Sequence, residues 1–434
     1  MSMDEAELSL LLELTQVPTA AGREQGVIAF ISGWAAARPE VRLSRDRAGN
    51  ITLGFVPGEQ KRSAKGRSKA GKAPPVRPLY ITAHMDHPAF VVERVLAPET
   101  VEVSFRGGVS DVFFTDAPIT LHTSAGTLAA TLTGECGSSA LGKHYTVEVD
   151  EGGGNAAAAE AVRPGDIGTW RLPAAHVDEA GLLHTPACDD LAALAAALCA
   201  MDRMRAVRAS GGKGAAAAFE HVRLLFTRAE EIGFIGAIAA VRLKTIPKTA
   251  VVIALENSRA FAESPIGGGP IVRVGDRLSI FTPWVTAACA ARAEEVFGGA
   301  STPTAAQTAA AAAKRPWQRK LMAGGACEAS VFCHAGYDAT CICLPLGNYH
   351  NMTNLEMHQA GTYDAAKMGP ARCGPETIHT KDFLGLVDLL VALGERLPRP
   401  EEQSFGKRLE KLYKEKGFVL TGQRPGPRGA KNQA

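Results

Sequence analysis

Apolar segments of strand length alternate with helical segments through the second half of the chain. Two strands are expected at Val222–Thr227 and Ala250–Leu255, each close to a helix, and a third at Thr340–Pro345. The helices are expected at 191–204, 233–243 and 382–397. This alternation requires crossover connections and predicts a mostly parallel sheet covered on both faces.

The first half of the chain has a different texture. Helical spacing predicts helices at 4–15 and 22–37, and strands are expected at 41–43, 50–56 and 79–83. Short alternating runs with Gly-rich turns then follow, at 90–95, 101–105, 119–122, 127–133, 145–149 and 167–170. We therefore expect a three-layer α/β domain, residues 1–90 and 177–400, with a small barrel-like all-β domain inserted at 91–176 and a helix and basic tail at 401–434.

Composition excludes several classes of protein. The 434 residues carry 47 basic and 45 acidic side chains, a net charge of +2. This balance argues against an overall basic protein that binds nucleic acid or a membrane surface. No apolar run approaches the roughly 20 residues that span a bilayer, and the start does not resemble a secretory signal. The nine cysteines are scattered and form no Cys-x-x-Cys pair. A cytoplasmic protein is expected, with no nucleic-acid or membrane partner.

The segment 61–77 holds seven basic residues and no acidic or aromatic one. It can be read as a polyanion-binding patch or as a solvated insertion in a loop. The insertion is favoured, because no aromatic side chain offers a base a stacking surface. The Ala-rich segment 299–314 is likewise expected to be a loop.

Common catalytic motifs are absent: the chain has no His-Glu-x-x-His, no Gly-x-Ser-x-Gly and no Walker A loop. Instead, histidines and carboxylates stand at the ends of predicted strands, where ligands bind in open α/β sheets. They are His84 and Asp86, Glu230 and Glu231, Glu256 and His350, with Asp189 and Asp190 before a helix. Acidic side chains are rarely buried unless they are paired or bind a metal, so several at one sheet edge indicate a site.

Two histidines and three carboxylates suit two divalent ions such as Zn²⁺. Two close cations need a bridging carboxylate, for which Asp189 or Asp190 is placed. One carboxylate of the Glu230-Glu231 pair can bind metal while the other acts as general base. Asp86 can hold the second ring nitrogen of His84.

Six segments together resemble the di-zinc aminopeptidases of the tetrahedral (TET), glutamyl and deblocking type, some of which are labelled cellulase M. These segments are AHMDHPAF, VRPGDIGTW, CDDLAALAAAL, TRAEEIGFIGA, ALENSRA and LPLGNYHN. The resemblance implies a phosphorylase/hydrolase-like fold and hydrolysis of N-terminal residues from peptides. It implies Glu230 as base and Asp86 as orienting residue, with five metal ligands: His84, Asp189 (bridging), Glu231, Glu256 and His350.

The resemblance also implies two zinc ions, with cobalt or manganese as alternatives, and a homo-oligomer, from a dimer to a dodecamer, joined through the β insertion. It further predicts a cis peptide bond between Asp189 and Asp190. The chain departs from the family at His87-Pro-Ala, at Glu256 in place of Asp, and at Cys327-Glu328-Ala-Ser330. His87 is expected to be a loop residue, and a contact of Glu328 with substrate stays open. The rival functions are a related di-zinc carboxypeptidase or N-acyl amino acid deacetylase, and an inactive scaffold.

Overall fold

The structure is a computed structural model that describes residues 4–57, 76–154, 156–212, 214–299, 316–398 and 404–422. Outside these ranges lie most of the basic segment 61–77, residues 300–314 of the loop predicted at 299–314, and the tail after residue 422. Predictions made for those segments stay predictions.

The central sheet has eight strands. β12, β3, β13 and β16 run parallel to one another, while β2 and β14 join them antiparallel on either side. In spatial order the strands are β1 (Val41–Arg45), β2 (Ile51–Phe55), β12 (Val222–Thr227), β3 (Leu79–His84), β13 (Val251–Arg259), β16 (Asp338–Leu346), β14 (Ile271–Asp276) and β15 (Gln318–Met322). The mostly parallel sheet predicted from the alternation is confirmed.

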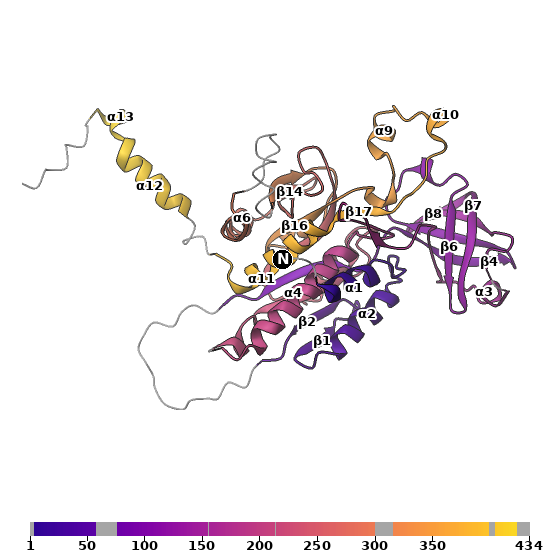
Figure 1. The fold of residues 1–434 in the computed structure, drawn as a ribbon, viewed down its shortest axis with the longest axis horizontal. Helices are drawn as coiled ribbons and strands as arrows, with labels where there is room; N and C mark the ends of the chain where they lie inside the picture. Colours follow the sequence, from indigo (N-terminus) through magenta and orange to yellow (C-terminus); the bar gives the residue numbers. More distant parts are fainter. Residues whose placement is uncertain are drawn as a thin grey trace, which may run out of the picture.

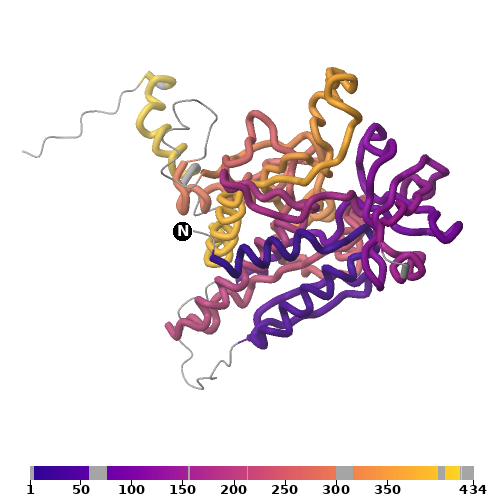
Figure 2. Tube along the Cα trace, turned by 45° about the vertical axis from the view of Figure 1, so that its right-hand side comes forward, coloured from indigo at the N-terminus to yellow at the C-terminus, as the bar shows by residue number. Residues whose placement is uncertain are grey.

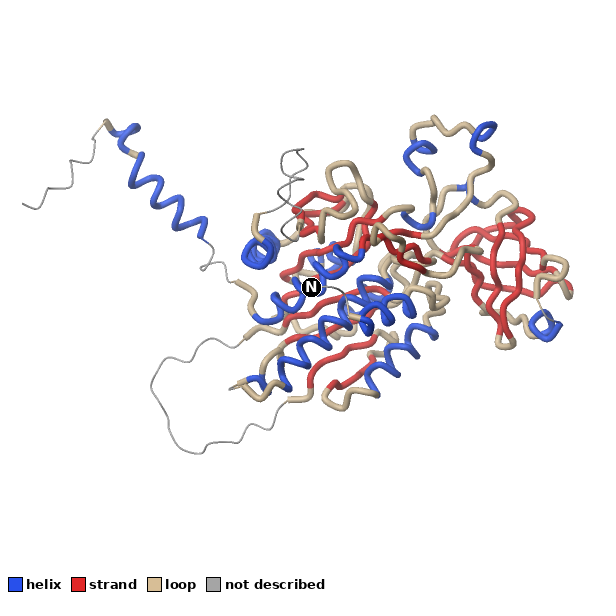
Figure 3. Tube along the Cα trace, in the orientation of Figure 1, coloured by secondary structure: helices blue, strands red, loops and turns tan. Residues whose placement is uncertain are grey.

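Helices cover both faces of this sheet (Figure 1; Figure 3). The larger hydrophobic cluster joins the sheet to α1 (Glu5–Leu14), α2 (Gln25–Ala36), α4 (Leu191–Ala209), α6 (Pro283–Phe297) and α11 (Thr380–Glu395). A smaller cluster joins the other face to α5 (Ile235–Arg242) and α8 (Glu328–His334). Successive side chains of β3 point to opposite faces of the sheet: Leu79 and Ile81 belong to the first cluster and Tyr80 to the second. Both faces of the sheet are therefore apolar, and helices cover each of them.

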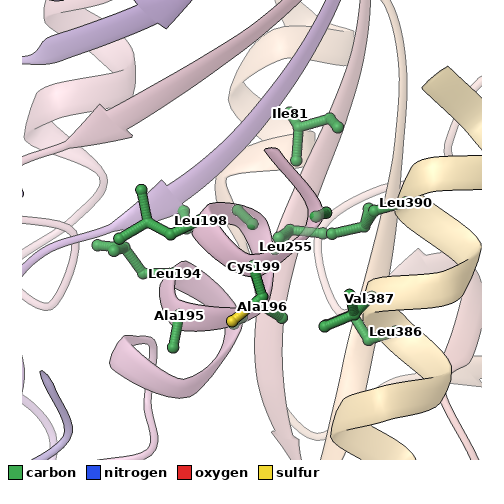
Figure 4. Close-up of a cluster of buried hydrophobic side chains, with 14 of the residues drawn as sticks. Ile81, Leu194, Ala195, Ala196, Leu198, Cys199, Leu255, Leu386, Val387 and Leu390 are labelled. Carbon is green, nitrogen blue, oxygen red and sulfur yellow. The ribbon is translucent and has the colours of Figure 1, made fainter. Parts of the chain in front are cut away.

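The core between α4, α11 and the sheet is drawn in Figure 4. Leu198 of α4 and Leu390 of α11 are fully buried there together with Ile81. Burial of a leucine or isoleucine side chain contributes about 1.5–3 kcal/mol, so this interface holds α4 rigidly against the strands. Rigidity matters because α4 begins directly after Asp189 and Asp190.

The inserted segment forms a closed barrel at one end of the molecule (Figure 1; Figure 2). Its strands are β4 (Ala89–Ala97), β5 (Thr100–Arg106), β8 (Gly142–Val149), β7 (Gly126–Ser139), β6 (Pro118–Thr123) and β9 (Ile167–Trp170), in that spatial order. Aromatic side chains fill it: Phe114 stacks on Tyr145 at 4.6 Å between ring centroids, and Trp170 lies 4.9 Å from Phe90. The barrel therefore has its own hydrophobic core.

Smaller elements complete the chain. A three-stranded sheet comprises β10 (His176–Val177), β11 (Leu182–Thr185) and β17 (Glu376–His379). Short helices are α3 (Ala156–Glu160), α9 (Leu355–Gln359), α10 (Ala365–Met368), α12 (Ser404–Lys416) and α13 (Phe418–Thr421), with 3-10 turns η1 (Asp111–Phe113), η2 (Ala215–Ala217) and η3 (Tyr349–Asn351). None of the helices in the described part of the chain is long and apolar enough to cross a bilayer.

The predicted fold class is confirmed, but some predicted ends were wrong. β13 continues to Arg259, so Glu256 lies inside the strand rather than closing it. α4 continues to Ala209, five residues beyond the predicted end at Met204. In both places the element continues through polar residues, whereas the apolar pattern used for the prediction ends earlier.

Candidate functional site

Four neighbouring parallel strands bring the predicted site residues to one edge of the sheet. His84 is the last residue of β3, Glu256 lies in the last half of β13, and Glu230 and Glu231 follow β12. His350 lies in the turn η3 that follows β16. All are buried or nearly so, and Asp189, which precedes α4, joins them.

Asp189 lies between the two imidazoles. Its Oδ1 is 3.3 Å from His84 Nε2, and its Oδ2 is 3.5 Å from His350 Nε2. Each carboxylate oxygen therefore faces a different histidine. The peptide bond between Asp189 and Asp190 is cis, as predicted.

A further carboxylate accompanies each imidazole. Glu256 Oε1 lies 3.8 Å from His84 Nε2, and Glu231 Oε2 lies 3.5 Å from His350 Nε2. The five side chains thus form two groups that share Asp189, one around His84 and one around His350. Asp190 is different, because its Oδ2 faces the backbone nitrogen of His84 at 3.3 Å.

Asp86 contacts the site in a way that its spacing from His84 did not predict. The nearest acceptor for His84 Nδ1 is the Asp86 backbone carbonyl at 3.0 Å, whereas the Asp86 carboxylate is 3.5 Å away. That carboxylate accepts hydrogen bonds from the backbone nitrogens of Glu230 at 2.9 Å and Glu231 at 3.0 Å. Asp86 therefore anchors the backbone of the Glu230-Glu231 pair as well as the imidazole.

Two loop residues at the site have backbone conformations that residues other than glycine rarely adopt. Ala229, directly before Glu230, has φ 52°, and His350 has φ 53°. Such strain persists only where the surrounding contacts hold it, and it gathers at functional sites.

Burial dominates the electrostatics of the cluster. It raises the pKa of Glu231 to about 7 and raises the pKa of Glu230 and Glu256 above the usual range. Burial acts in the same direction on Asp189, but the neighbouring imidazoles of His350 and His84 bring its pKa below its usual value. Four carboxylates gathered in a low-dielectric site repel one another unless protons or cations compensate their charge.

The donor set fits divalent metal ions. Ligand atoms of His84, Asp189 and Glu231 lie within 4.8 Å of one another, as do those of His84, Glu230 and Glu256. Asp189 Oδ1 and Glu231 Oε1 are buried and accept no hydrogen bond of good geometry from any described residue. Buried acceptors without donors, combined with imidazole nitrogens, are the ligands that Zn²⁺ and similar ions take.

Glu376, on β17, is a site residue that the sequence did not predict. Its Oε2 accepts hydrogen bonds from the backbone nitrogens of Cys188 at 2.6 Å and Asp189 at 3.0 Å. Its Oε1 accepts a hydrogen bond from the backbone nitrogen of His350 at 2.9 Å. It therefore ties the two loops that carry Asp189 and His350. Its only sequence signal was its position, as an acidic residue at the start of a short segment before a helix. Acidic residues in such positions are common on protein surfaces.

Two other residues close to the cluster have defined contacts. His87 is buried, with Nδ1 2.5 Å from the Asp189 carbonyl oxygen and Nε2 3.0 Å from Asn351 Oδ1, so both its ring nitrogens are occupied. Glu328 is also buried and accepts a hydrogen bond from Thr82 at 3.3 Å. Burial raises the pKa of Glu328 to about 7.

The barrel also reaches the site. His350 Nδ1 lies 2.6 Å from the carbonyl oxygen of Gly108, in the loop after β5. Glu256 also lines a pocket, together with Ser258, Phe261, Arg273, Met322 and Leu355 among others. A substrate bound at the cluster therefore has a cavity beside it.

Comparisons with known proteins agree with this architecture. The family model of the M42 glutamyl aminopeptidases matches residues 68–296, more than half of the chain, a range that includes every candidate ligand except His350. No curated protein matches the sequence.

Solved structures with the same fold include three archaeal enzymes. A TET aminopeptidase from a marine-sediment Thaumarchaeota archaeon is 18% identical, with a TM-score of 0.64 over 92% of this chain and 98% of that one. The TET1 peptidase of Pyrococcus horikoshii is 17% identical, with a TM-score of 0.60 over 90% and 100%. An aminopeptidase from Desulfurococcus kamchatkensis is 18% identical, with a TM-score of 0.60 over 90% and 94%.

Proposed function

Because the chain belongs to the M42 glutamyl aminopeptidase family, we propose that it is a metal-dependent aminopeptidase that removes N-terminal residues from peptides. The observation that carries the proposal is the position of Asp189, whose two carboxylate oxygens face His84 Nε2 and His350 Nε2 separately. A carboxylate in this position can bridge two divalent ions.

The proposed ligands divide into two sets. His84 and Glu256 would hold one ion, His350 and Glu231 the other, and Asp189 would bridge them. When bound, the two ions would supply Lewis-acid polarisation of the scissile carbonyl and acidification of a water molecule. Zinc fits this nitrogen and oxygen donor set, and cobalt or manganese are alternatives.

Glu230 is the proposed general base. Its backbone is anchored by Asp86, and burial raises the pKa of its carboxyl, which makes the carboxylate a stronger base. It would take a proton from the attacking water and deliver it to the leaving amine. Asp86 would position Glu230 and His84 without reacting.

A metal and substrate series tests the proposal. The purified full chain is stripped with a chelator, reloaded with Zn²⁺, Co²⁺ or Mn²⁺, and assayed on tripeptides with free or acetylated amines. We expect about two ions per chain and hydrolysis of the free-amine peptides only. Hydrolysis of the acetylated peptides alone would instead favour the deacetylase, cleavage from the carboxyl end the carboxypeptidase, and metal binding without hydrolysis an inactive scaffold.

We also propose that the protein is a homo-oligomer in the cytoplasm. The Pyrococcus horikoshii relative is described as assembling into a tetrahedron or a large octahedral shell. The barrel, in the proposed domain 91–176, has its own core and lies at one end of the molecule, where it can contact another copy. All nine cysteines are unpaired, which supports the cytoplasmic location.

Light scattering tests the oligomer. The full chain is expected to give at least a dimer, and a variant with residues 91–176 replaced by a short linker a smaller species. Two monomeric proteins would contradict the proposed role of the barrel.

A further inference from the structure

A second cavity, of about 260 Å³, lies where the barrel meets the larger domain. Its walls come from the loop after α1, from barrel strands β6 and β9 with the segment that follows β9, and from the loops beside the metal cluster. The described residues that line it include neither a candidate metal ligand nor Glu230. A water molecule takes up about 30 Å³ in the liquid, so the cavity has room for a small organic molecule.

Polar side chains line the barrel side of this cavity. Thr120 of β6 and Thr169 of β9 are partners in the register of the barrel. His122, two residues after Thr120 and on the same face of β6, has its Nε2 2.9 Å from Thr169 Oγ1. All three side chains are partly exposed. The barrel therefore presents hydroxyl and imidazole groups to a ligand.

The rest of the wall is largely apolar and rigid. It includes Val17, Leu172 and Ala187 and four prolines, Pro18, Pro88, Pro173 and Pro186. Because the proline ring fixes φ, the backbone around the cavity is restrained and the cavity is largely preformed. The polar side chains Gln16 and Thr19 on this side already donate hydrogen bonds to backbone carbonyl oxygens, both at 2.8 Å.

The cavity lacks the charged groups that would select a charged ligand. No Asp, Glu, Lys or Arg is among the described residues that line it. Burial lowers the pKa of His122 to about 4, so its imidazole is neutral at pH 7. Both ring nitrogens of His87 already contact protein oxygens. A charged ligand would lose its hydration here without gaining a counter-ion, which favours a neutral one.

Two residues of the wall also hold the loops of the metal cluster. His87 Nδ1 lies 2.5 Å from the Asp189 carbonyl oxygen, and His87 Nε2 lies 3.0 Å from Asn351 Oδ1. Asn351 directly follows His350, and its Nδ2 donates a hydrogen bond to the Pro186 carbonyl oxygen at 2.9 Å. A ligand that contacts His87 and Asn351 therefore acts on the backbone that carries Asp189 and His350.

We propose that this cavity is a second ligand site, which takes a neutral, largely apolar small molecule and acts as an effector site for the metal cluster. Ligand pockets are common at domain interfaces and combine mainly apolar walls with a few polar groups. The coupling is reciprocal, so the ligand changes the affinity for metal by the same factor as metal changes the affinity for the ligand. This role is separate from peptide hydrolysis.

Three probes of similar shape test the ligand class: neutral benzamide, anionic benzoate and protonated benzylamine. An NMR titration of the chelator-stripped full chain is expected to give a dissociation constant on the order of 1 mM for benzamide, which is ordinary for so small a ligand. The two charged probes should bind about tenfold more weakly or worse, because the cavity offers them no counter-ion.

Variants locate the bound probe. Thr120→Phe fills the cavity from the barrel side and should weaken benzamide binding about tenfold, while Thr120→Leu fills less of it and should weaken binding less. Thr133→Phe is the matched control, at an exposed barrel threonine on β7 that does not line the cavity, and it should bind benzamide like the parent.

Zinc titration of the same stripped protein tests the effector role. Saturating benzamide should change the zinc affinity of the parent about threefold or more, and should leave that of Thr120→Phe unchanged. Equal zinc affinity of the parent with and without benzamide would overturn the effector role.

The remaining outcomes concern the site itself. Absence of benzamide binding, or binding that is the same in Thr120→Phe as in the parent, would overturn the second site. Tighter binding of benzoate than of benzamide, abolished by Thr120→Phe, would overturn the neutral ligand class. None of these measurements requires hydrolysis, so they succeed or fail independently of the aminopeptidase proposal.

Discussion

The Asp86 carboxylate accepts a hydrogen bond from the backbone nitrogen of Glu230 at 2.9 Å. The second oxygen of the same carboxylate accepts one from Glu231 at 3.0 Å, and Asp86 is fully buried. One side chain at the end of β3 thereby sets the position of two consecutive residues after β12. The proposed base and one proposed ligand depend on the same anchor.

Asp86→Asn should therefore impair both functions of the pair. An amide can accept only one of the two hydrogen bonds and presents a donor to the other backbone nitrogen. We expect metal affinity to fall about 10- to 100-fold, as is typical when a residue that supports a ligand is lost, and kcat to fall at saturating metal. Metal titration followed by kinetics checks this. Unchanged affinity and kcat would show that the anchor is dispensable.

The strands and helices that place the site could be predicted because their patterns are local. The short apolar run that forms most of β3, for example, depends only on neighbouring residues. Glu256 was predicted after its strand because the apolar run ends at Leu255. In the fold, Glu256 and Asn257 are also buried. Glu256 lies in the cluster, and Asn257 donates a hydrogen bond to the Cys188 carbonyl oxygen at 2.7 Å.

Neither Glu376 as a site residue nor Arg273 as a pocket residue could be predicted, because both positions depend on contacts between distant segments. Glu376 meets Cys188, which is 188 residues away in the sequence. The pocket around Arg273 combines β13 and β14 with the turn and helix near residues 349–359. No periodicity records which side chains such long-range contacts bring together.

Glu376→Gln should weaken the metal site without touching a ligand. The three backbone N–H groups that share this carboxylate cannot all be satisfied by an amide, and each unsatisfied buried donor costs about 1–3 kcal/mol. We expect a lower melting temperature and weaker metal binding, with activity largely restored at saturating metal. Glu395→Gln, at a half-exposed ion pair, is the control that should change neither. Activity that stays low at saturating metal would assign Glu376 a more direct role.

The metal-free protein should lose stability as the pH rises from 5 to 8, partly because of Glu328. The pKa of this carboxyl is raised by burial from 4.5 to about 7. Its protonated form is favoured in the folded state, so its stabilising contribution is complete below pH 4.5 and is lost as the pH rises through 7. Glu328→Gln should reduce the loss of unfolding free energy by up to about 3 kcal/mol. Urea unfolding at pH 5 and pH 8 measures this. The same change in unfolding free energy between the two pH values in parent and variant would contradict the prediction.

The last prediction separates Glu230 from Glu231. Glu231 lies 3.5 Å from His350 Nε2, whereas the proposed role of Glu230 is to carry a proton. Glu230→Gln keeps the shape and removes the proton acceptor, so we expect metal content near that of the parent and a rate lower by about 10²–10⁴-fold. Glu231→Gln should instead lose one metal ion, and added Zn²⁺ should restore part of the activity. Metal analysis and kinetics on both variants decide the matter: loss of a metal in Glu230→Gln, with both metals kept in Glu231→Gln, would exchange the two roles. If neither change lowers peptide hydrolysis, catalysis takes place elsewhere on the protein.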